Sequence, residues 1–550
     1  MKRDIHKLKD PFFDVVIVGG GIHGATAAYH ATLAGMKTAL VDKSDFCHAT
    51  SANSLKIIHG GLRYLQHLNI KRMRQSILSR RELMLFAPHL VRPLACIMPT
   101  YGFGLRGKEV MRLALLFNDI ISWDRNKGIA RGSRLPKGFT ITKDKCLKVI
   151  PDIETKGLRG ASLWHDALAL NTERLLVEYI MAATENGAKA ANYLEVKKIT
   201  ANDHNTYSIE LEDKINGAQS TIRTRFVINA AGPWIDNICF KSQIHCREKH
   251  RWALALNIIV NKGLFPDHGV GLEGSNSYND KDAVLHRGKR LYFFVPWRGY
   301  TMIGTDYKIY RGSPDNLHIT KDDLRAMLTE INGIYPQADL KFSDVTFYHV
   351  GLLPASTDYD EQGNAVQLDK NSQIIDHETD GLKGIITIKG VKYTTAPYVA
   401  REVVKLLQKK NASKHPKPNE QTKNTPTLPK RESQPISPHL LTRYGIRSHN
   451  LAQYCAKDDS EQTWISTSPP LLPGEVEYFI QEEMALKLSD IVFRRTDLGT
   501  CECPPLETLE KLADLMAMDL DWDEKEKNNQ INEVLERYSP IEQIHRRFPS

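Results

Sequence analysis

The first 42 residues of the chain carry the pattern that most restricts its fold. Residues 15–18 (V-V-I-V) form an apolar run rich in β-branched side chains, and G-G-G-I-H-G at 19–24 follows at once. The run predicts a buried strand, and residues 25–34 predict the helix after the glycines. Residues 37–41 predict a second strand that ends at Asp42. This order of elements predicts a Rossmann-like α/β unit that binds a dinucleotide.

Each residue of this fingerprint has a physical role in the prediction. Gly19 makes the tight turn, Gly21 lets the backbone approach a pyrophosphate, and Gly24 lets helix and strand pack closely. The free N–H groups at the helix start suit an anion. Asp42 lies 18 residues after Gly24, where an acid can accept hydrogen bonds from the adenosine ribose. The fingerprint alone leaves NAD and FAD open.

A second informative segment spans residues 49–65, A-T-S-A-N-S-L-K-I-I-H-G-G-L-R-Y-L. It combines small hydroxylic residues and a Gly-Gly pair with a Lys, a His, an Arg and a Tyr. We expect it to run beside the cofactor. The residues predicted to contact the cofactor here are Thr50, Ser51, Ser54, Lys56, Gly60 and Gly61.

The segment resembles the A-T-S-S-x-S-S-K-L-I-H-G-G-L-R-Y-L of the FAD-dependent glycerol-3-phosphate dehydrogenases, which belong to the D-amino-acid-oxidase-like flavoproteins. Further motifs of that family have counterparts in the same order: N-T-E-R-L at 171–175, V-I-N-A-A-G-P-W at 227–234, F-V-P-W at 294–297, I-G-T-D at 303–306, G-V-K-Y-T-T at 390–395, L-T-R-Y-G at 441–445 and L-S-D-I-V-F-R-R-T-D-L-G at 488–499. The resemblance covers most of the chain.

The resemblance implies that the cofactor is FAD and that residues 49–54 hold the flavin. It implies a second dinucleotide-binding edge at Gly232, and a closing segment over the flavin at Gly390 and Thr394. The implied reaction moves a hydride from a substrate carbinol to the flavin and then passes the electrons to quinone or another acceptor. The protein would supply positioning, proton handling and electrostatics.

Four residues are predicted to take part in catalysis because they match family positions. Arg63 and Tyr64 would face the small-molecule substrate, and Lys392 would favour the reduced flavin or contact the substrate oxygen. His59 could act as a base or hold the flavin side of the site structurally.

The motifs that grip phosphate in the family are altered. Leu353 stands where the family has the Arg of G-V-R-P, and Leu368 where it has the Arg of I-T-R-D. Asn257 replaces the His of K-G-S-H, and Asn cannot act as a general base. A hydrogen bond to a charged group contributes about 1.5–3 kcal/mol, so losing two arginines would weaken phosphate binding by orders of magnitude. Cations that could compensate are Arg251, Arg287, Arg298 and Lys370.

Three functions therefore stay open on the sequence. The first is a glycerol-3-phosphate dehydrogenase with a rearranged phosphate site. The second is an FAD dehydrogenase or oxidase for another small polyol, hydroxy acid or amine that lacks the phosphate. The third is a flavoprotein that binds FAD without turnover, as a scaffold or sensor. Retention of Arg63, Tyr64 and Lys392 argues against the third.

Composition restricts the class of protein and its location. The chain has 550 residues, of which 41% are hydrophobic and 25% charged, as in soluble globular proteins. Its eight cysteines match no zinc or disulfide spacing, so we expect a reducing compartment, no metal site, and Cys47 as a packing residue. Neither a secretory signal nor a spanning segment is recognisable. We expect a cytoplasmic protein.

The net charge of +9 suggests two kinds of anionic binding partner. Nucleic acid is disfavoured, because the basic residues are not interleaved with aromatic residues. A peripheral site on the inner face of the cytoplasmic membrane is the other interpretation. Residues 70–86 and 106–125 have the apolar and basic pattern of a membrane-surface helix. For both segments the alternative is an ordinary amphipathic helix packed on the core, and this is the favoured interpretation of 70–86. A homodimer is a further assembly to consider.

The predicted fold is an α/β Rossmann-like FAD-binding domain with a discontinuous antiparallel-sheet substrate domain and an all-α C-terminal domain. The FAD-binding domain is expected at 12–100, 160–240 and 345–407, and the substrate or cap domain at 101–159 and 241–344. Residues 408–437 are rich in Lys, Asn, Thr and Pro and predict a linker. Residues 438–550 would form the helical domain.

Overall fold

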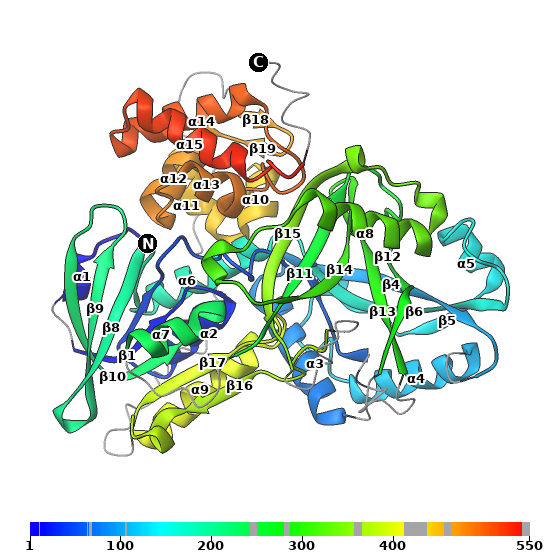
Figure 1. Ribbon diagram of the computed structural model, residues 1–550, viewed down its shortest axis with the longest axis horizontal. Helices are drawn as coiled ribbons and strands as arrows, with labels where there is room; N and C mark the ends of the chain where they lie inside the picture. Colours follow the sequence, from blue (N-terminus) through cyan, green and yellow to red (C-terminus); the bar gives the residue numbers. More distant parts are fainter. Residues whose placement is uncertain are drawn as a thin grey trace.

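The computed structural model describes residues 1–9, 12–62, 64, 69–104, 107–242, 250–279, 287–356, 366–411, 437–455 and 464–541. Within these residues two large sheets lie side by side, and a group of helices from the end of the chain covers them at one end (Figure 1). The predicted linker falls almost wholly outside the described residues, as does Arg63.

The first sheet is the predicted dinucleotide-binding unit. Its strands follow the order β16 (Gln373–Asp376), β17 (Ile385–Lys389), β10 (Gln219–Asn229), β1 (Phe13–Val18), β2 (Thr38–Val41) and β7 (Lys189–Ala191), with β8 (Leu194–Asn202) and β9 (Thr206–Asp213) joined through β10. Strand β1 pairs in parallel with both β2 and β10. Helices α2 (Ile22–Leu33), α6 (Thr172–Glu185) and α9 (Ala396–Lys410) pack together on this unit.

The β-branched run of β1 explains why that strand is central. Its residues from Val15 to Ile17 have no exposed surface, as expected for a strand covered on both faces. The helix after the glycines runs from Ile22 to Leu33, and Gly35 follows it at φ +77°. The prediction of a Rossmann-like α/β unit is therefore confirmed.

The second sheet is mostly antiparallel. Its order is β15 (Val345–Pro354), β11 (Trp252–Val260), β14 (Tyr300–Tyr310), β13 (Arg287–Trp297), β12 (Gly269–Asn279), β4 (Val91–Tyr101), β6 (Leu158–Ala169) and β3 (Ile57–Ile58), with β5 (Phe139–Thr142) beside β6. Only β12 and β4 pair in parallel among the described pairings of this sheet. Strands β4 and β15, and most of β6, lie inside ranges that we assigned to the FAD-binding domain, yet they hydrogen-bond in this second sheet.

The C-terminal region is helical, as predicted. It contains α10 (Pro438–Tyr444), α11 (Ser448–Cys455), α12 (Pro473–Glu483), α13 (Leu488–Asp490), α14 (Leu506–Leu520) and α15 (Glu524–Glu536), and a small hairpin of β18 (Ser466–Thr467) and β19 (Pro470–Leu471). The hairpin is the only strand pair among the described residues of this region.

Buried ion pairs fasten the C-terminal helices to the dinucleotide-binding unit. Asp45, in the loop after β2, accepts hydrogen bonds from Arg495 Nη1 and Nη2 at 2.8 Å each and from Arg494 Nε at 2.6 Å. Arg174 on α6 reaches Glu483 Oε1 at 2.5 Å. Burial alone would raise the pKa of Asp45, but the two arginines outweigh it and hold the pKa at about 2. Removing one partner of such a pair leaves an uncompensated buried charge.

Helices α3 (Ile70–Phe86) and α4 (Lys108–Ile121) differ in how they are covered. Helix α3 buries Met73, Ile77 and Leu83, so it packs on the core as an ordinary amphipathic helix. Helix α4 buries only Leu115. No helix among the described residues is long and apolar enough to cross a membrane.

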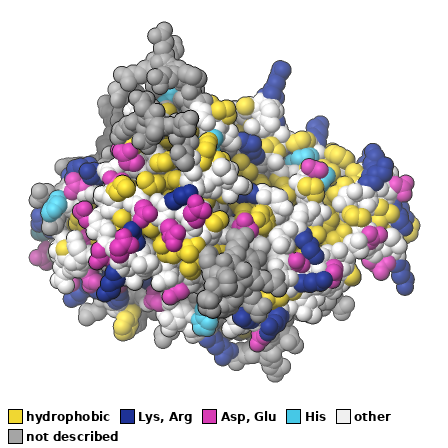
Figure 2. All heavy atoms as spheres, turned by 90° about the horizontal axis from the view of Figure 1, so that it is seen from above, with side chains coloured by type: hydrophobic (Ala, Val, Ile, Leu, Met, Phe, Trp, Pro, Cys, Tyr) yellow, Lys and Arg dark blue, Asp and Glu magenta, His cyan; other side chains and the backbone are white. Residues whose placement is uncertain are grey.

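The remaining helices are α1 (His6–Lys9), α5 (Lys143–Val149), α7 (Ile235–Lys241) and α8 (Lys321–Ile334). On the face shown in Figure 2, basic and acidic side chains are interspersed, with hydrophobic side chains between them. The positive net charge therefore does not form one continuous field on that face.

Candidate active site

A cavity of about 1400 Å³ is lined by residues of both sheets and of the loops between them. From the first sheet and its helix come Gly19, Gly21 and Asp42. From the second sheet come Asn257, Phe293 and Leu353, and α4 contributes Val110, Met111 and Ala114. The cavity therefore brings together almost all the segments that the sequence singled out.

The glycines of the fingerprint are fixed by close backbone contacts. Gly19 has φ +106°, and a β-carbon added there would lie 2.5 Å from the carbonyl oxygen of Ala230. A β-carbon on Gly24 would lie 1.8 Å from the carbonyl oxygen of Gly19, so α2 packs directly on the turn. Gly21 is the N-cap of α2 and provides no side-chain cap. The helix start thus presents N–H groups to the cavity, with that of Ile22 donating to Ser51 Oγ at 3.0 Å.

Asp42 lies at the end of β2 and lines the cavity. Its carboxylate accepts hydrogen bonds from the N–H of Gly20 at 2.5 Å and of Ser44 at 2.8 Å. Burial raises the pKa of Asp42 to about 6, although both N–H donors act in the opposite direction. The residue is positioned to accept further hydrogen bonds from a ligand in its ionised form.

The loop at 49–54 is fastened to the second sheet. Thr50 Oγ1 accepts a hydrogen bond from the N–H of Leu352 at 3.1 Å and donates one to its carbonyl oxygen at 3.0 Å. Gly351 lies close beside it, since a β-carbon there would lie 3.2 Å from the Cα of Thr50, which is a tight contact. Thr50, Ser51 and Ser54 all line the cavity.

Lys56 also lines the cavity, but its ammonium group is bound on the protein side. Its Nζ lies 2.8 Å from Glu173 Oε1 and 2.9 Å from Thr172 Oγ1. Both charged side chains are almost fully buried. Lys56 therefore anchors the 49–54 loop to the start of α6, and we interpret it as a support of the site.

The glycines predicted at the other edges of the site take different places. Gly232, Gly390 and Thr394 line the cavity, as does Gly61 at φ +88°. Gly60 is not among the residues that line the cavity, and a β-carbon there would meet Arg80 Nη1 at 2.3 Å.

His23 packs against Gly390, where a β-carbon would meet its ring at 2.3 Å. Burial lowers the pKa of His23 to about 4, so its ring is neutral, and its Nε2 has no hydrogen-bond partner among the described residues. A buried orphaned nitrogen at a cavity wall fits a bound polar ligand.

His59 and Asp166 form a pair at the cavity. His59 Nδ1 lies 3.2 Å from Asp166 Oδ2, while the ring is about half exposed and lines the cavity. Asp166 also accepts from Arg80 at 2.5 Å, from the N–H of Gly60 at 2.6 Å and from Trp164 Nε1 at 3.1 Å. Burial raises the pKa of Asp166, but His59 and Arg80 outweigh it and hold the pKa well below its usual range.

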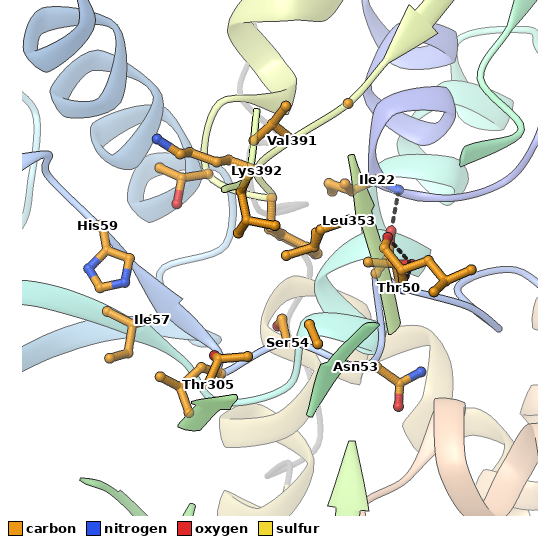
Figure 3. Close-up of a pocket in the computed structure, with 18 of the residues that line it drawn as sticks. Ile22, Thr50, Asn53, Ser54, Ile57, His59, Thr305, Leu353, Val391 and Lys392 are labelled. Atoms are coloured by element: carbon orange, nitrogen blue, oxygen red, sulfur yellow. Dashed lines mark hydrogen bonds between the residues drawn. The ribbon is translucent and has the colours of Figure 1, made fainter. Parts of the chain in front are cut away.

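Tyr64 and Lys392 are brought together, as the motif match implied. Lys392 Nζ lies 4.1 Å from the centre of the Tyr64 ring, and the guanidinium of Arg72 lies 4.2 Å from it. All three line the cavity. Figure 3 shows Lys392 reaching into the cavity from the segment that carries Val391, with His59 on the same side of the view.

Both leucines that we matched to family arginines line the cavity. Leu353 projects into the cavity from β15 (Figure 3), and Leu368 lines it from a segment that bridges to Ala355. Asn257 is buried, and its Oδ1 accepts a hydrogen bond from Thr305 Oγ1 at 2.7 Å. Asn257 thus holds Thr305, the residue of β14 at which the register with β11 shifts, rather than a substrate proton.

Of the cations expected to compensate, Lys370 lines the cavity. Arg298 instead forms an ion pair with Asp497 of the C-terminal region, and the side chain of Arg287 lies outside the described ones. Arg251 is not among the residues that line the cavity. Arg290, which we did not predict, lines it and pairs with Asp306.

Three other features could be judged only in three dimensions. Asp166 and Arg72 belong to no motif that we recognised, and a strand period of two would only have placed Asp166 on one face of β6.

Cys47 is buried, and burial raises the pKa of its thiol well above its usual value. Cys47 is therefore a packing residue, as predicted.

Comparison with known proteins decides the family. The family model described as "FAD dependent oxidoreductase" matches residues 14–406, which is more than half of the chain. The chain belongs to this FAD-dependent oxidoreductase family. The model described as "C-terminal domain of alpha-glycerophosphate oxidase" matches residues 400–527. The prediction that the cofactor is FAD is confirmed.

Similar proteins extend over nearly the whole chain. A glycerol-3-phosphate dehydrogenase of Synechocystis sp. is 29% identical over 522 residues, covering 90% of this chain and 91% of that protein. An aerobic glycerol-3-phosphate dehydrogenase of Staphylococcus epidermidis is 26% identical, covering 97% and 96%. The crystal structure of the glycerol-3-phosphate dehydrogenase from Bacillus halodurans complexed with FAD has a TM-score of 0.70 at 20% identity, covering 98% of this chain and 96% of that one. The chain is an FAD-dependent oxidoreductase similar to glycerol-3-phosphate dehydrogenases.

Proposed function

We propose that this oxidoreductase oxidises the carbinol carbon of a small hydroxylated substrate, as its relatives named glycerol-3-phosphate dehydrogenase do. The observation that carries the proposal is the His59–Asp166 pair, which faces the same cavity as the glycine fingerprint. FAD, when bound, supplies a two-electron acceptor for the hydride. Its pyrophosphate would lie at the start of α2 beside Gly21, and its ribose would bond to Asp42.

In this proposal His59 removes the hydroxyl proton. Asp166 accepts the Nδ1 hydrogen of His59, which leaves Nε2 as the free basic atom, and it stabilises the imidazolium once the proton has moved. Arg80, Gly60 and Trp164 keep Asp166 ionised and in place. The buried Asn257 does not take this role, because its amide is bonded to Thr305.

The experiment is reduction of the flavin in the holoenzyme without oxygen. Mixing with substrate should bleach the yellow oxidised flavin, and His59→Asn should slow bleaching by about 10²–10⁴-fold with FAD content unchanged. The exposed His318, whose Nδ1 contacts only its own loop at Asn316 in the described structure, provides a matched control as His318→Asn. Equal rates in His59→Asn and the unaltered enzyme would contradict the assignment.

We further propose that the electrons pass to a membrane quinone and that α4 rests on the inner face of the cytoplasmic membrane. Leu113, Leu116, Phe117 and Ile120 fall at helical spacing on α4 and are all more than half exposed. Trp123, just after the helix, is 77% exposed. Val110, Met111 and Ala114, on an adjoining side of the same helix, line the cavity, so a quinone entering from the bilayer would have a short route to the flavin.

The surroundings of this apolar stripe favour a lipid surface. Exposed basic residues nearby in the chain are Arg112, Lys127, Arg131, Arg134 and Lys137. Each basic residue near an anionic bilayer contributes about 1 kcal/mol. An apolar stripe with basic neighbours is the pattern of a helix that lies in the interface of a membrane.

Co-sedimentation with phosphatidylglycerol vesicles tests this surface. The holoenzyme should bind these vesicles, and the double variant Leu116→Asp with Phe117→Asp should bind at least about tenfold less. Phe240→Asp is the control, because Phe240 is exposed at a separate site, on α7. The membrane proposal is wrong if the enzyme does not bind the vesicles and instead forms a homodimer that the double variant converts to monomers. The stripe would then be a subunit interface.

A further inference from the structure

We propose that the preferred substrate is a 2-hydroxy acid with an apolar side chain. Its carboxylate would bind between Arg72 and Lys392 at Tyr64, and its side chain would lie against the wall that contains Leu353 and Leu368. This inference rests on the proposed function, because the carbinol carbon must lie between these two regions and beside His59. It adds a substrate class that the relatives' names do not contain.

The apolar wall is continuous across three strands of the second sheet. In the register of β11 and β15, Leu353 lies opposite Ala253 and Gly351 opposite Ala255. On the other side of β11, Ala255 lies opposite Tyr307 of β14. Because side chains alternate along a strand, Ala255 and Leu353 share one face. Trp252, Leu291, Phe293 and Leu368 also line the cavity.

Leu353, Leu368 and Ala255 offer apolar contacts, and the cavity is also lined by Lys370 and by Arg290, which pairs with Asp306. Ala255 is almost fully buried, and Gly351 lies close to Thr50, whose Cα would be 3.2 Å from a β-carbon at that glycine. A doubly charged phosphate placed there would lose its water and gain no charged donor from Leu353, Leu368 or Ala255. An alkyl side chain would gain contacts with all three.

Positive charge is concentrated at the Tyr64 region instead. The Arg72 guanidinium and the Lys392 ammonium group lie 4.2 Å and 4.1 Å from the Tyr64 ring centre. Arg72 and Lys392 therefore both lie against Tyr64 in the lining of the cavity. A carboxylate is the anion that a planar guanidinium binds in bidentate form. Figure 3 shows Lys392 and Leu353 on different segments of the cavity lining.

The reaction balances with this substrate. The carbinol C–H bond breaks, and its hydrogen would leave with both electrons as a hydride to FAD, the cofactor of this family. The hydroxyl proton moves to Nε2 of His59, and the C–O bond becomes a carbonyl. The product is the 2-oxo acid, and one hydride and one proton are released for each molecule oxidised. His59 then returns its proton to solvent, since its ring is about half exposed.

Binding and flavin reduction should be measured together on the holoenzyme. Calorimetry with 2-hydroxy-2-methylpentanoate, which has no hydrogen on its carbinol carbon, reports binding without turnover. Anaerobic bleaching is then compared for 2-hydroxyisocaproate, lactate and glycerol 3-phosphate. We expect 2-hydroxyisocaproate to bleach with at least tenfold higher kcat/KM than the other two.

The possible results separate this inference from the proposed function. If glycerol 3-phosphate bleaches more efficiently than 2-hydroxyisocaproate, the substrate class is wrong and carbinol oxidation stands. If the methylated acid binds but no carbinol compound bleaches, the binding assignment stands and the proposed function fails. If the methylated acid does not bind, the inference is overturned.

Variants test the two regions separately. Arg72→Met should weaken binding of the methylated acid at least tenfold, whereas the exposed Arg325→Met should not change it. Leu353→Arg should lower kcat/KM for 2-hydroxyisocaproate and raise it for glycerol 3-phosphate, with Leu441→Arg on α10 as the control. If Leu353→Arg loses FAD, Leu368→Lys tests the same wall. If a folded variant keeps the same preference for 2-hydroxyisocaproate over glycerol 3-phosphate, the substrate side chain does not lie against this wall.

Discussion

The two halves of the cavity are built in different ways. The half that carries the fingerprint is determined by backbone contacts, such as the 1.8 Å that would separate a β-carbon on Gly24 from the carbonyl oxygen of Gly19. The half opposite is determined by side chains on β11, β14 and β15, of which Leu353 and Asn257 depart from the family motifs. Backbone contacts exclude nearly every substitution, while a cavity wall accepts many. The cofactor half is therefore preserved while the substrate half changes.

The largest effect should come from breaking the backbone contact. Gly24→Ala pushes α2 away from the turn at Gly19, because the β-carbon overlaps backbone that cannot move freely. We expect FAD occupancy to fall at least about a hundredfold, measured as the ratio of flavin to protein absorbance. Gly333→Ala in α8 meets open space and is the matched control. A yellow, fully loaded Gly24→Ala protein would contradict this account.

A second prediction concerns the ion pairs that support the cofactor half from the C-terminal region. Arg495→Ala leaves the buried Asp45 with Arg494 as its remaining arginine partner, and should reduce the free energy of unfolding by up to about 3–5 kcal/mol. Urea titration measures this change. Arg325→Ala, from an exposed pair with Asp322, should change it by less than about 1 kcal/mol. Similar midpoints for the two variants would show that the buried pairs do not join the regions.

The substrate half should respond in rate and keep its flavin. Lys392→Ala removes a charge at Tyr64, and losing a contact of about 1.5–3 kcal/mol should lower kcat/KM by about tenfold to a hundredfold. Flavin content should stay the same. Lys405→Ala on α9, from an exposed pair with Glu402, is the control. Loss of FAD in Lys392→Ala alone would place this residue in the cofactor half.

The smallest expected effect is a pH dependence of FAD affinity. The pKa of Asp42 is raised to about 6 by burial, so the carboxyl is ionised above that pH and protonated below it. Only the ionised form accepts two further ribose hydrogen bonds. FAD affinity should therefore fall as the pH drops through 6, by up to about tenfold between pH 6 and pH 5. Fluorescence titration of the FAD-free protein should show this slope, and Asp42→Asn should flatten it.

The same contrast explains what the sequence could predict. The glycine spacing and Asp42 predicted the Rossmann-like unit and a dinucleotide cofactor, which are confirmed, since each requirement is local in the chain. Asp166 and Arg72 were missed because their roles depend on β6 and α3 lying beside the 49–65 segment, which no local pattern encodes. Strands β4 and β15 were grouped with the wrong neighbours for a related reason. Their apolar patterns fit either sheet, and only the long-range pairing of β15 with β11 and of β4 with β6 separates the two.

The ion pairs of Asp45 have a consequence for how the chain is made. Asp45 and Arg495 are separated by 450 positions in the sequence. During synthesis from the N-terminus, the loop after β2 therefore carries an unpaired charge until the last part of the chain has left the ribosome. A chain that ends before Arg494 would therefore leave Asp45 without both of its arginine partners.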